Sequence, residues 1–225
     1  MTGEQKRGLP AALRVAGMLG IGRAARWARL EDIGLGVVQG TPRRRRWLRV
    51  RRVAIVAVDV DTGAGGAAVW LATRLHGRRP ETWRMLYERA GAGWCAVGGG
   101  GETEDRGFLA GRPSALTRGP ASLLVSWGSS AARSSADRAP GGTARTSADA
   151  RWIACETFRV ATEVTSLQVG GRSVEVPAHG KVIVAWVSPP TSLPTHRPPI
   201  ACLRADRTVL TELASDEHVD SATLD

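Results

Sequence analysis

Residues 158–187 constrain the fold most, because apolar and polar side chains alternate there on either side of two short turns. Alternation with a period of two is typical of half-buried β-strands. Gly170 and Gly171 separate the first two alternating runs, and such a pair tolerates the positive φ angles of a two-residue hairpin turn. A second turn at residues 177–180 leads into a more apolar run over residues 181–187. The stretch therefore predicts three consecutive antiparallel strands.

Further strand-like runs flank this stretch on both sides. They cover residues 82–88, 93–97, 121–127, 152–160, 200–204 and 208–213, the last two as a hairpin around residues 205–207. We therefore expect a mainly β domain over residues 80–213, built as an antiparallel β-sandwich of two packed sheets. Segments expected to lack regular structure are a flexible acidic loop that begins with the glycines 98–101, a disordered loop over 129–150 and an acidic tail over 214–225.

The basic residues gather at the N-terminal end of the chain. Residues 1–52 hold thirteen basic and three acidic side chains, so they account for the whole formal net charge of +10. Residues 53–225 balance eighteen basic against eighteen acidic side chains. This asymmetry indicates an anionic partner for the N-terminal part, either lipid headgroups or nucleic acid. The residues predicted to bind that anionic surface are Arg43, Arg44, Arg45, Arg46, Arg49, Arg51 and Arg52.

Residues 1–52 are expected to form a poorly ordered basic arm. A short amphipathic helix is indicated between residues 13 and 30, but Gly17, Gly20 and Gly22 interrupt it. Each interior glycine costs about 1 kcal/mol relative to alanine, so the helix is predicted to be weak. No secretory signal peptide is expected, because no early apolar run leads to a small-residue cleavage site.

An apolar segment over residues 53–74 follows the arginines directly and is about as long as a membrane-spanning helix. Arginines before such a segment match the positive-inside arrangement, with a cytoplasmic N-terminus and an extracytoplasmic C-terminal domain. Asp59 and Asp61 oppose this, because each costs roughly 2.5–3.5 kcal/mol near the centre of a span, and each Val, Ile or Leu returns only about 0.3–0.6. The alternative is a buried strand over 53–58, a glycine-rich turn and a helix over 67–76.

In that alternative, Asp59 and Asp61 lie at a strand end beside the glycines of residues 63–66. A glycine turn at a helix N-terminus can hold phosphate, and paired aspartates can hold a metal ion. The match to the dinucleotide-binding signature is loose, and no second βαβ unit follows it. A solvated structural turn is therefore favoured over a nucleotide or metal site.

The rest of the chain offers little recognisable chemistry. It has no CxxC pair, no histidines at metal-ligand spacing, no GxSxG elbow and no P-loop, so neither a cofactor nor a metal is predicted. Cys155 and Cys202 both fall in predicted strands, so a disulfide between them is one alternative. The other is that both, with Cys95, are buried thiols. The tryptophans predicted to lie in the core or on a sheet face are Trp94, Trp127, Trp152 and Trp186.

Residues 158–213 resemble the extracytoplasmic β-domains of uncharacterised actinobacterial single-span membrane proteins. The likeness lies in residues 164–177 (VTSLQVGGRSVEVP), in the Val-Ala-Trp of residues 184–186 and in residues 205–213 (ADRTVLTEL). In that family a single apolar helix usually precedes the domain, after a basic cytoplasmic stub. The resemblance therefore implies a membrane anchor over residues 53–74, and it brings no catalytic residues.

Three hypotheses follow for the function. The first is a non-enzymatic binding or structural domain tethered to the cell membrane, with the β-domain extracytoplasmic and the arginines on anionic lipid headgroups. The second is a soluble, cytoplasmic protein that uses the same arginines to bind nucleic acid. The third is a nucleotide- or metal-dependent enzyme that uses Asp59 and Asp61.

Overall fold

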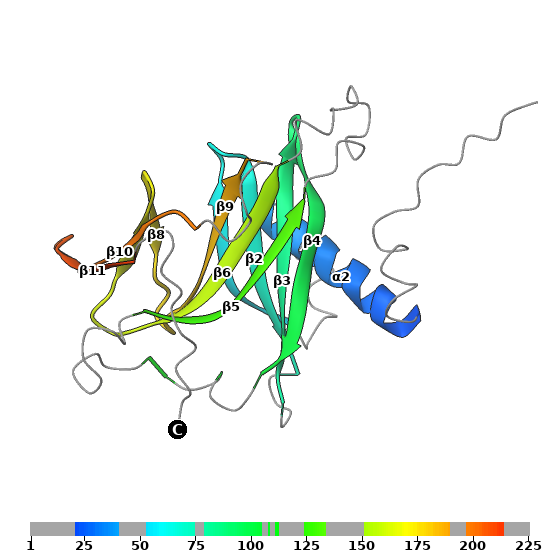
Figure 1. Ribbon diagram of the computed structural model, residues 1–225. Helices are drawn as coiled ribbons and strands as arrows, with labels where there is room; N and C mark the ends of the chain where they lie inside the picture. The colour runs from blue at the N-terminus through cyan, green and yellow to red at the C-terminus, as the bar shows by residue number, and fades with distance from the viewer. Residues whose placement is uncertain are drawn as a thin grey trace, which may run out of the picture.

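The computed structural model describes residues 21–40, 53–74, 79–104, 108, 111–112, 124–133, 151–189 and 197–213. Strands make up more than half of these residues and pair in antiparallel fashion, which confirms the prediction of a mainly β chain. The elements, shown in Figure 1, are α2 (Ile21–Val38), β1 (Val53–Asp61), β2 (Gly66–Thr73), β3 (Glu81–Ala90), β4 (Gly93–Thr103), β5 (Leu124–Arg133), β6 (Trp152–Val160), β7 (Ser166–Val169), β8 (Arg172–Glu175), β9 (Lys181–Ser188), β10 (Ile200–Leu203) and β11 (Val209–Leu213).

The strands form three sheets. Sheet A has the order β1-β2-β3-β4, sheet B the order β5-β6-β9, and sheet C the order β11-β10-β7-β8. Figure 1 shows α2 on one side of sheets A and B and sheet C on the other side. The molecule is therefore layered in the order α2, sheet A, sheet B, sheet C.

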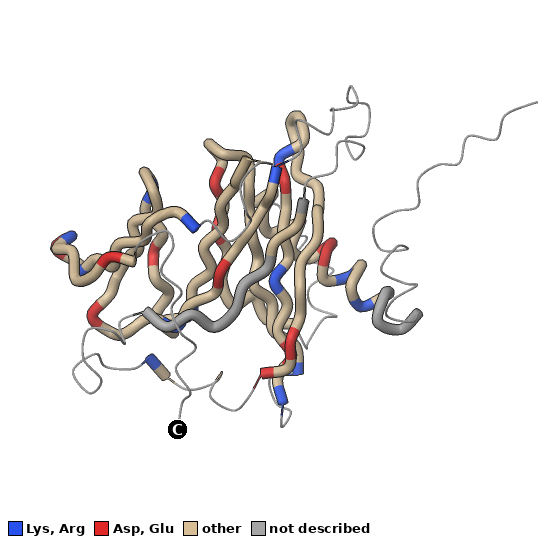
Figure 2. Tube along the Cα trace, in the orientation of Figure 1, with Lys and Arg blue, Asp and Glu red and all other residues tan. Residues whose placement is uncertain are grey.

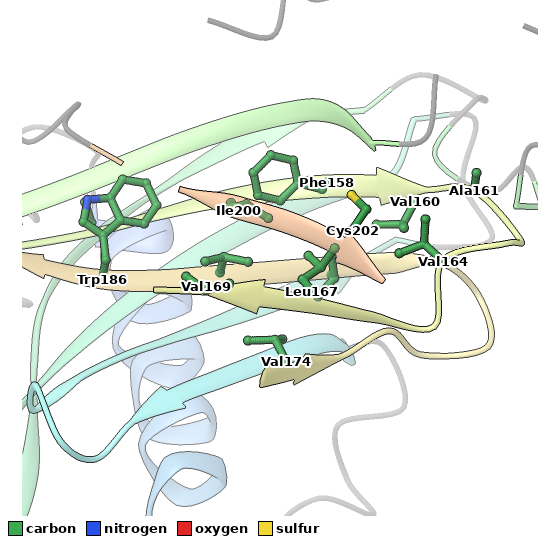
Figure 3. Packing of buried hydrophobic residues seen from close by; sticks show 13 residues of the cluster. Phe158, Val160, Ala161, Val164, Leu167, Val169, Val174, Trp186, Ile200 and Cys202 are labelled. Carbon is green, nitrogen blue, oxygen red and sulfur yellow. The ribbon is translucent and has the colours of Figure 1, made fainter. Parts of the chain in front are cut away.

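Three buried clusters hold these layers together. In the first, Trp27 and Leu30 of α2 pack on sheet A. The second joins sheets A and B and includes Trp70 of β2 and Ile183 of β9. The third joins sheets B and C around Phe158, as Figure 3 shows. Sheet A is covered on both faces, and its inner strand β2 is accordingly buried and almost entirely apolar.

Residues 53–74 form two paired strands, so the strand predicted over residues 53–58 is confirmed as part of β1, whereas neither predicted helix is present. β1 pairs with β2 from Val53–Thr73 to Asp61–Gly66, and β2 continues the sheet by pairing with β3. Every residue of β2 is buried. A strand buried on both faces and a helix give the same continuous apolar run, so periodicity cannot tell them apart. The predicted transmembrane helix and the predicted helix over residues 67–76 are both corrected to strands of sheet A.

The same pairing extends the β-domain toward the N-terminus. Its first strand begins at Val53, whereas the sequence placed the start of the domain near residue 80. Over the part of the chain that the structure describes, no helix is long and apolar enough to cross a bilayer.

The C-terminal strands agree closely with the predictions. β6 covers residues 152–160 as expected, and β7 and β8 meet at Gly170, which has a φ of 55°. The turn before β9 ends at Gly180, which has a φ of 70°. One loop was predicted wrongly, since Gly98 to Gly101 belong to β4. β5 reaches Arg133, so the first five residues of the loop predicted to be disordered over 129–150 are instead part of a strand. Residues 134–150 of that predicted loop and the acidic tail lie outside the described residues.

Helix α2 is the second departure from the sequence prediction, which expected a poorly ordered arm. Its inner face packs on sheet A, and the Tyr87 hydroxyl donates a hydrogen bond to the Glu31 carbonyl at 3.0 Å. Burial, and then the nearby charges of Glu31 and Asp32, raise the pKa of Tyr87, so that hydroxyl stays protonated. Tertiary packing thus supports a helix whose glycines alone would make it weak.

The contact between Gly34 and Tyr87 gives a test of this packing. A Cβ at Gly34 would overlap the Tyr87 hydroxyl. Gly34→Ala should therefore lower the free energy of unfolding by about 1–3 kcal/mol, although the same change in an open helix would raise it. Urea unfolding measures the effect. Gly93→Ala is the control, because a Cβ there meets nothing within 4 Å. Equal changes in the free energy of unfolding for the two variants would contradict this packing of α2 on sheet A.

Candidate functional site

The predicted arginine site lies outside the described residues. It comprises Arg43, Arg44, Arg45, Arg46, Arg49, Arg51 and Arg52. Its two flanks are described: α2 ends at Val38 and β1 begins at Val53. α2 packs on sheet A and β1 belongs to it, so the described segments before and after the run both contact the same sheet.

Asp59, one of the two aspartates considered for a metal or nucleotide, is buried at the meeting point of all three sheets. Its carboxylate accepts hydrogen bonds from Arg172 Nη1 and Nη2, both at 2.6 Å, and from the Ala185 backbone N–H at 2.7 Å. Arg172 Nη2 also donates to the Ala185 carbonyl at 2.6 Å. Asp59 lies in sheet A, Arg172 in sheet C and Ala185 in sheet B. The arrangement is a bidentate ion pair that links the sheets.

Asp61 extends this contact without creating an open site. Its Oδ2 lies 3.3 Å from Arg172 Nε, and its Oδ1 accepts the Ala64 N–H at 2.9 Å. One guanidinium therefore serves both aspartates. The sequence could not reveal this, because Arg172 follows Asp59 by 113 positions.

The β1–β2 turn, residues 62–65, is also held by arginines. Arg151 Nη1 donates to the Ala64 carbonyl at 3.0 Å, and its Nη2 donates to buried Glu88 at 3.1 Å. Arg89 Nη1 donates to the Thr62 carbonyl at 3.4 Å. A phosphate site needs backbone N–H groups turned toward the ligand, whereas here carbonyl oxygens are turned toward guanidinium groups. The glycine turn is followed by a strand, so it also lacks the helix N-terminus of a phosphate site.

Among the described residues, no group of three or more His, Cys, Asp or Glu side chains is placed to hold a metal ion. None of the three cysteines forms a disulfide. Cys155 belongs to the cluster between sheets A and B, and Cys202 to the cluster between sheets B and C. The alternative of a disulfide between them is therefore wrong. Burial raises the pKa of the Cys202 thiol to about 12, as expected for an inert core thiol.

Of the tryptophans predicted to be core or sheet-face residues, Trp186 is buried between sheets B and C, and Trp94 packs against the α2 cluster. Trp152 is half-buried on β6, and the side chain of Trp127 lies outside the described residues.

A polar group that the sequence analysis missed lies between sheets A and B. Buried Arg84 of β3 pairs with Glu102 of β4, and Thr82 donates to buried Glu104. Lys181 of β9, also buried, lies over the Phe108 ring with its Nζ 5.4 Å from the centroid. Lys181 is one of only two lysines in the chain, and this rarity was the one sequence feature that could have drawn attention to it.

Two other arginines, buried Arg197 and half-buried Arg112, have structural roles. Arg197 pairs with Glu156 at 3.1 Å and lies over Phe158, 6.0 Å from the ring centroid. Arg112 Nη2 donates to the carbonyls of Ala161 and Val164, each at 2.5 Å, which fixes the connection between β6 and β7. Basic side chains in the described body thus serve mainly to satisfy internal carboxylates and carbonyls.

Comparison with protein-family models, with curated proteins and with solved structures found no match to this chain.

The ion pair at Asp59 predicts a large loss of stability when one charge is removed. Asp59→Asn removes the bidentate counter-charge of the Arg172 guanidinium and leaves it only the contact of its Nε with Asp61. Removing one partner of a buried ion pair typically costs about 3–5 kcal/mol. Glu175→Gln is a matched control, because Glu175 lies exposed on the same strand as Arg172 and should change stability by less than about 0.5 kcal/mol. Urea unfolding measures both variants. An Asp59→Asn variant as stable as the control would show that the pair is not structural.

Proposed function

We propose that this chain is a non-enzymatic β-sheet binding domain that attaches to an anionic membrane surface through the arginine-rich run of residues 43–52. The observation that carries the proposal is the location of charge. Residues 1–52 hold the whole net charge, and the rest of the chain is balanced. The run contains no acidic residue of its own, and the next acidic residue after it, Asp59, already pairs with Arg172.

The charges of the described body support this assignment because they are largely used internally. Carboxylates pair with arginines from other parts of the chain, and at least one side chain of each pair is buried. The pairs are Glu88–Arg151, Glu102–Arg84 and Glu156–Arg197. Figure 2 shows Lys and Arg interspersed with Asp and Glu along the described strands. When the rest of a protein is nearly neutral and its basic residues are concentrated in one segment, that segment is expected to bind a polyanion.

The sequence of the run favours lipid over nucleic acid. Trp47, Leu48 and Val50 are interleaved with the arginines. Tryptophan concentrates at membrane–water interfaces, and apolar side chains there bury area in the headgroup region. Each arginine near an anionic leaflet contributes about 1 kcal/mol, so seven of them form a substantial attraction.

The proposal needs no membrane span over residues 53–74, whose apolar residues are used in sheet A. Attachment is then to the headgroup surface, with sheets A, B and C as a sandwich-like body on it. The extracytoplasmic location of that body stays a prediction without support from residues 53–74.

Vesicle sedimentation with the full-length chain tests the proposal. We expect binding to vesicles of phosphatidylserine and phosphatidylcholine and little binding to phosphatidylcholine alone. Arg43→Gln with Arg44→Gln should weaken binding by about thirtyfold, from about 1 kcal/mol for each arginine. Arg204→Gln with Arg207→Gln is the control, because it removes the same charge from the exposed β10–β11 turn.

Two results would contradict the proposal. One is equal binding of the two double variants, which would mean that net charge alone matters. The other is tighter binding to a short duplex DNA than to the anionic vesicles at the same salt concentration, with a steep salt dependence. That result would favour the nucleic-acid alternative.

A further inference from the structure

Side chains, and not a neighbouring strand, satisfy backbone N–H groups on the free edge of β9. β9 is an edge strand of sheet B and β1 is an edge strand of sheet A. The Ala185 N–H donates to Asp59 of β1 at 2.7 Å, so this edge of β9 faces β1. The Lys181 N–H points to the same edge, because residues four apart on a strand face the same way. It donates to Nδ1 of His179, in the turn before β9, at 3.1 Å.

The ring of His179 uses both of its nitrogens. Because Nδ1 accepts from Lys181, the other nitrogen is the one that donates to the Val56 carbonyl of β1. Val56 is the extra residue where the β1–β2 register shifts between Ile55 and Ala57, which is a β-bulge. The neutral ring therefore joins the turn before β9 to the bulge of β1.

The two bonds on this edge respond differently to acid. Histidine ordinarily gains a proton near pH 6.5, and the protonated ring has two donors and no acceptor. Protonation of His179 therefore removes the acceptor of the Lys181 N–H. The Ala185 bond does not involve the histidine, since its acceptor is Asp59, the first carboxylate along β1, which Arg172 holds in place.

The charged groups that face the ring are Lys181 and Arg112. Burial and then the charge of Lys181 lower the pKa of His179, and Arg112 lowers it further, although the hydrogen bond to the carbonyl of β1 partly opposes this. From the elements behind them, Arg159 of β6 is the ladder partner of Lys181, and Glu163 acts on Arg112. The surroundings thus hold the ring in the neutral form that the Lys181 bond requires.

The backbone beside the ring is fixed, but the ring itself can move. The Val160 N–H of β6 donates to the Gly180 carbonyl, and the Gly180 N–H donates to the Pro177 carbonyl, both at 2.8 Å. A Cβ at Gly180 would overlap Arg112, so this turn packs closely. The side chain of His179 is exposed. A protonated ring can therefore turn into solvent while the backbone of the turn stays on β6.

We propose that His179 is a pH-sensitive contact between sheets A and B, and that its protonation frees the Lys181 N–H and the Val56 carbonyl. Acid then opens this end of the β1–β9 edge, while the end held by Asp59 stays closed. Unpaired backbone groups on two edge strands become accessible as a result, and such groups can pair with another chain.

The direction of the effect on stability follows from the lowered pKa of His179. The unfolded chain binds the proton first as the pH falls below about 6.5, because its histidine keeps the ordinary pKa. The stabilisation from the neutral ring is therefore present above that pH and is lost below it. The urea midpoint of unfolding should fall between about pH 7.5 and pH 5.5.

Amide hydrogen exchange of the full-length, ¹⁵N-labelled protein tests the proposal. Protection factors, corrected for the intrinsic exchange rate, are measured at about pH 7.5 and pH 5.5. The protection of Lys181 should fall about three- to tenfold in acid, as expected for the loss of one hydrogen bond. Ala185 is the internal control on the same edge, and its protection should not change.

His179→Asn is the matched variant, because its side-chain oxygen can accept from the Lys181 N–H but does not titrate. Its Lys181 protection should be the same at both pH values. The proposal is overturned if acid leaves the Lys181 protection of the wild type unchanged or lowers that of Ala185 equally. A folded variant with the pH dependence of the wild type would also overturn it. The wild-type comparison decides even if the variant fails to fold, and no residue of the proposed membrane attachment takes part.

Discussion

The carboxylate of Asp59 and the guanidinium of Arg172 form the contact on which the arrangement of the three sheets depends. The pair spans sheets A and C, and Ala185 of sheet B satisfies both partners with its N–H and its carbonyl. A buried charge without its partner is costly, so each sheet must be in place for the other two to be satisfied. We infer that this pair fixes how the sheets meet, whereas the apolar clusters between them supply most of the stabilisation.

The sequence predicted the fold well where its signals are local. Strands β7 and β8 alternate around the turn at Gly170, and the turn before β9 ends at Gly180. Both glycines have the positive φ that their turns require. For residues 53–74 the sequence left a membrane-spanning helix and a strand followed by a helix as alternatives, and only the strand over residues 53–58 is confirmed. β2 was taken for a helix in both, because a strand covered on both faces has no alternation. Helix α2 was underestimated for a related reason, since its stability comes from sheet A and not from its own residues.

The candidate sites show the same difference between features visible in the local sequence and contacts that only the fold creates. The arginine run of residues 43–52 is visible in composition alone, and its proposed role rests on charge. Asp59 was noticed as a charge in an apolar segment, but its role depends on Arg172, which only the fold brings near. The buried pair of Arg84 with Glu102 carries no signal in the sequence, because only the pairing of β3 with β4 brings the two side chains together. Contacts between side chains on different strands could therefore not be predicted from the sequence.

A double-mutant cycle between Asp59→Asn and Arg172→Gln tests the central claim most directly. If the pair acts as one unit, the double variant should lose less free energy of unfolding than the two single variants together. We predict a coupling free energy of about 1.5 kcal/mol or more. Effects that add within about 0.5 kcal/mol would show that the two side chains act independently, and would contradict the account of how the three sheets are joined.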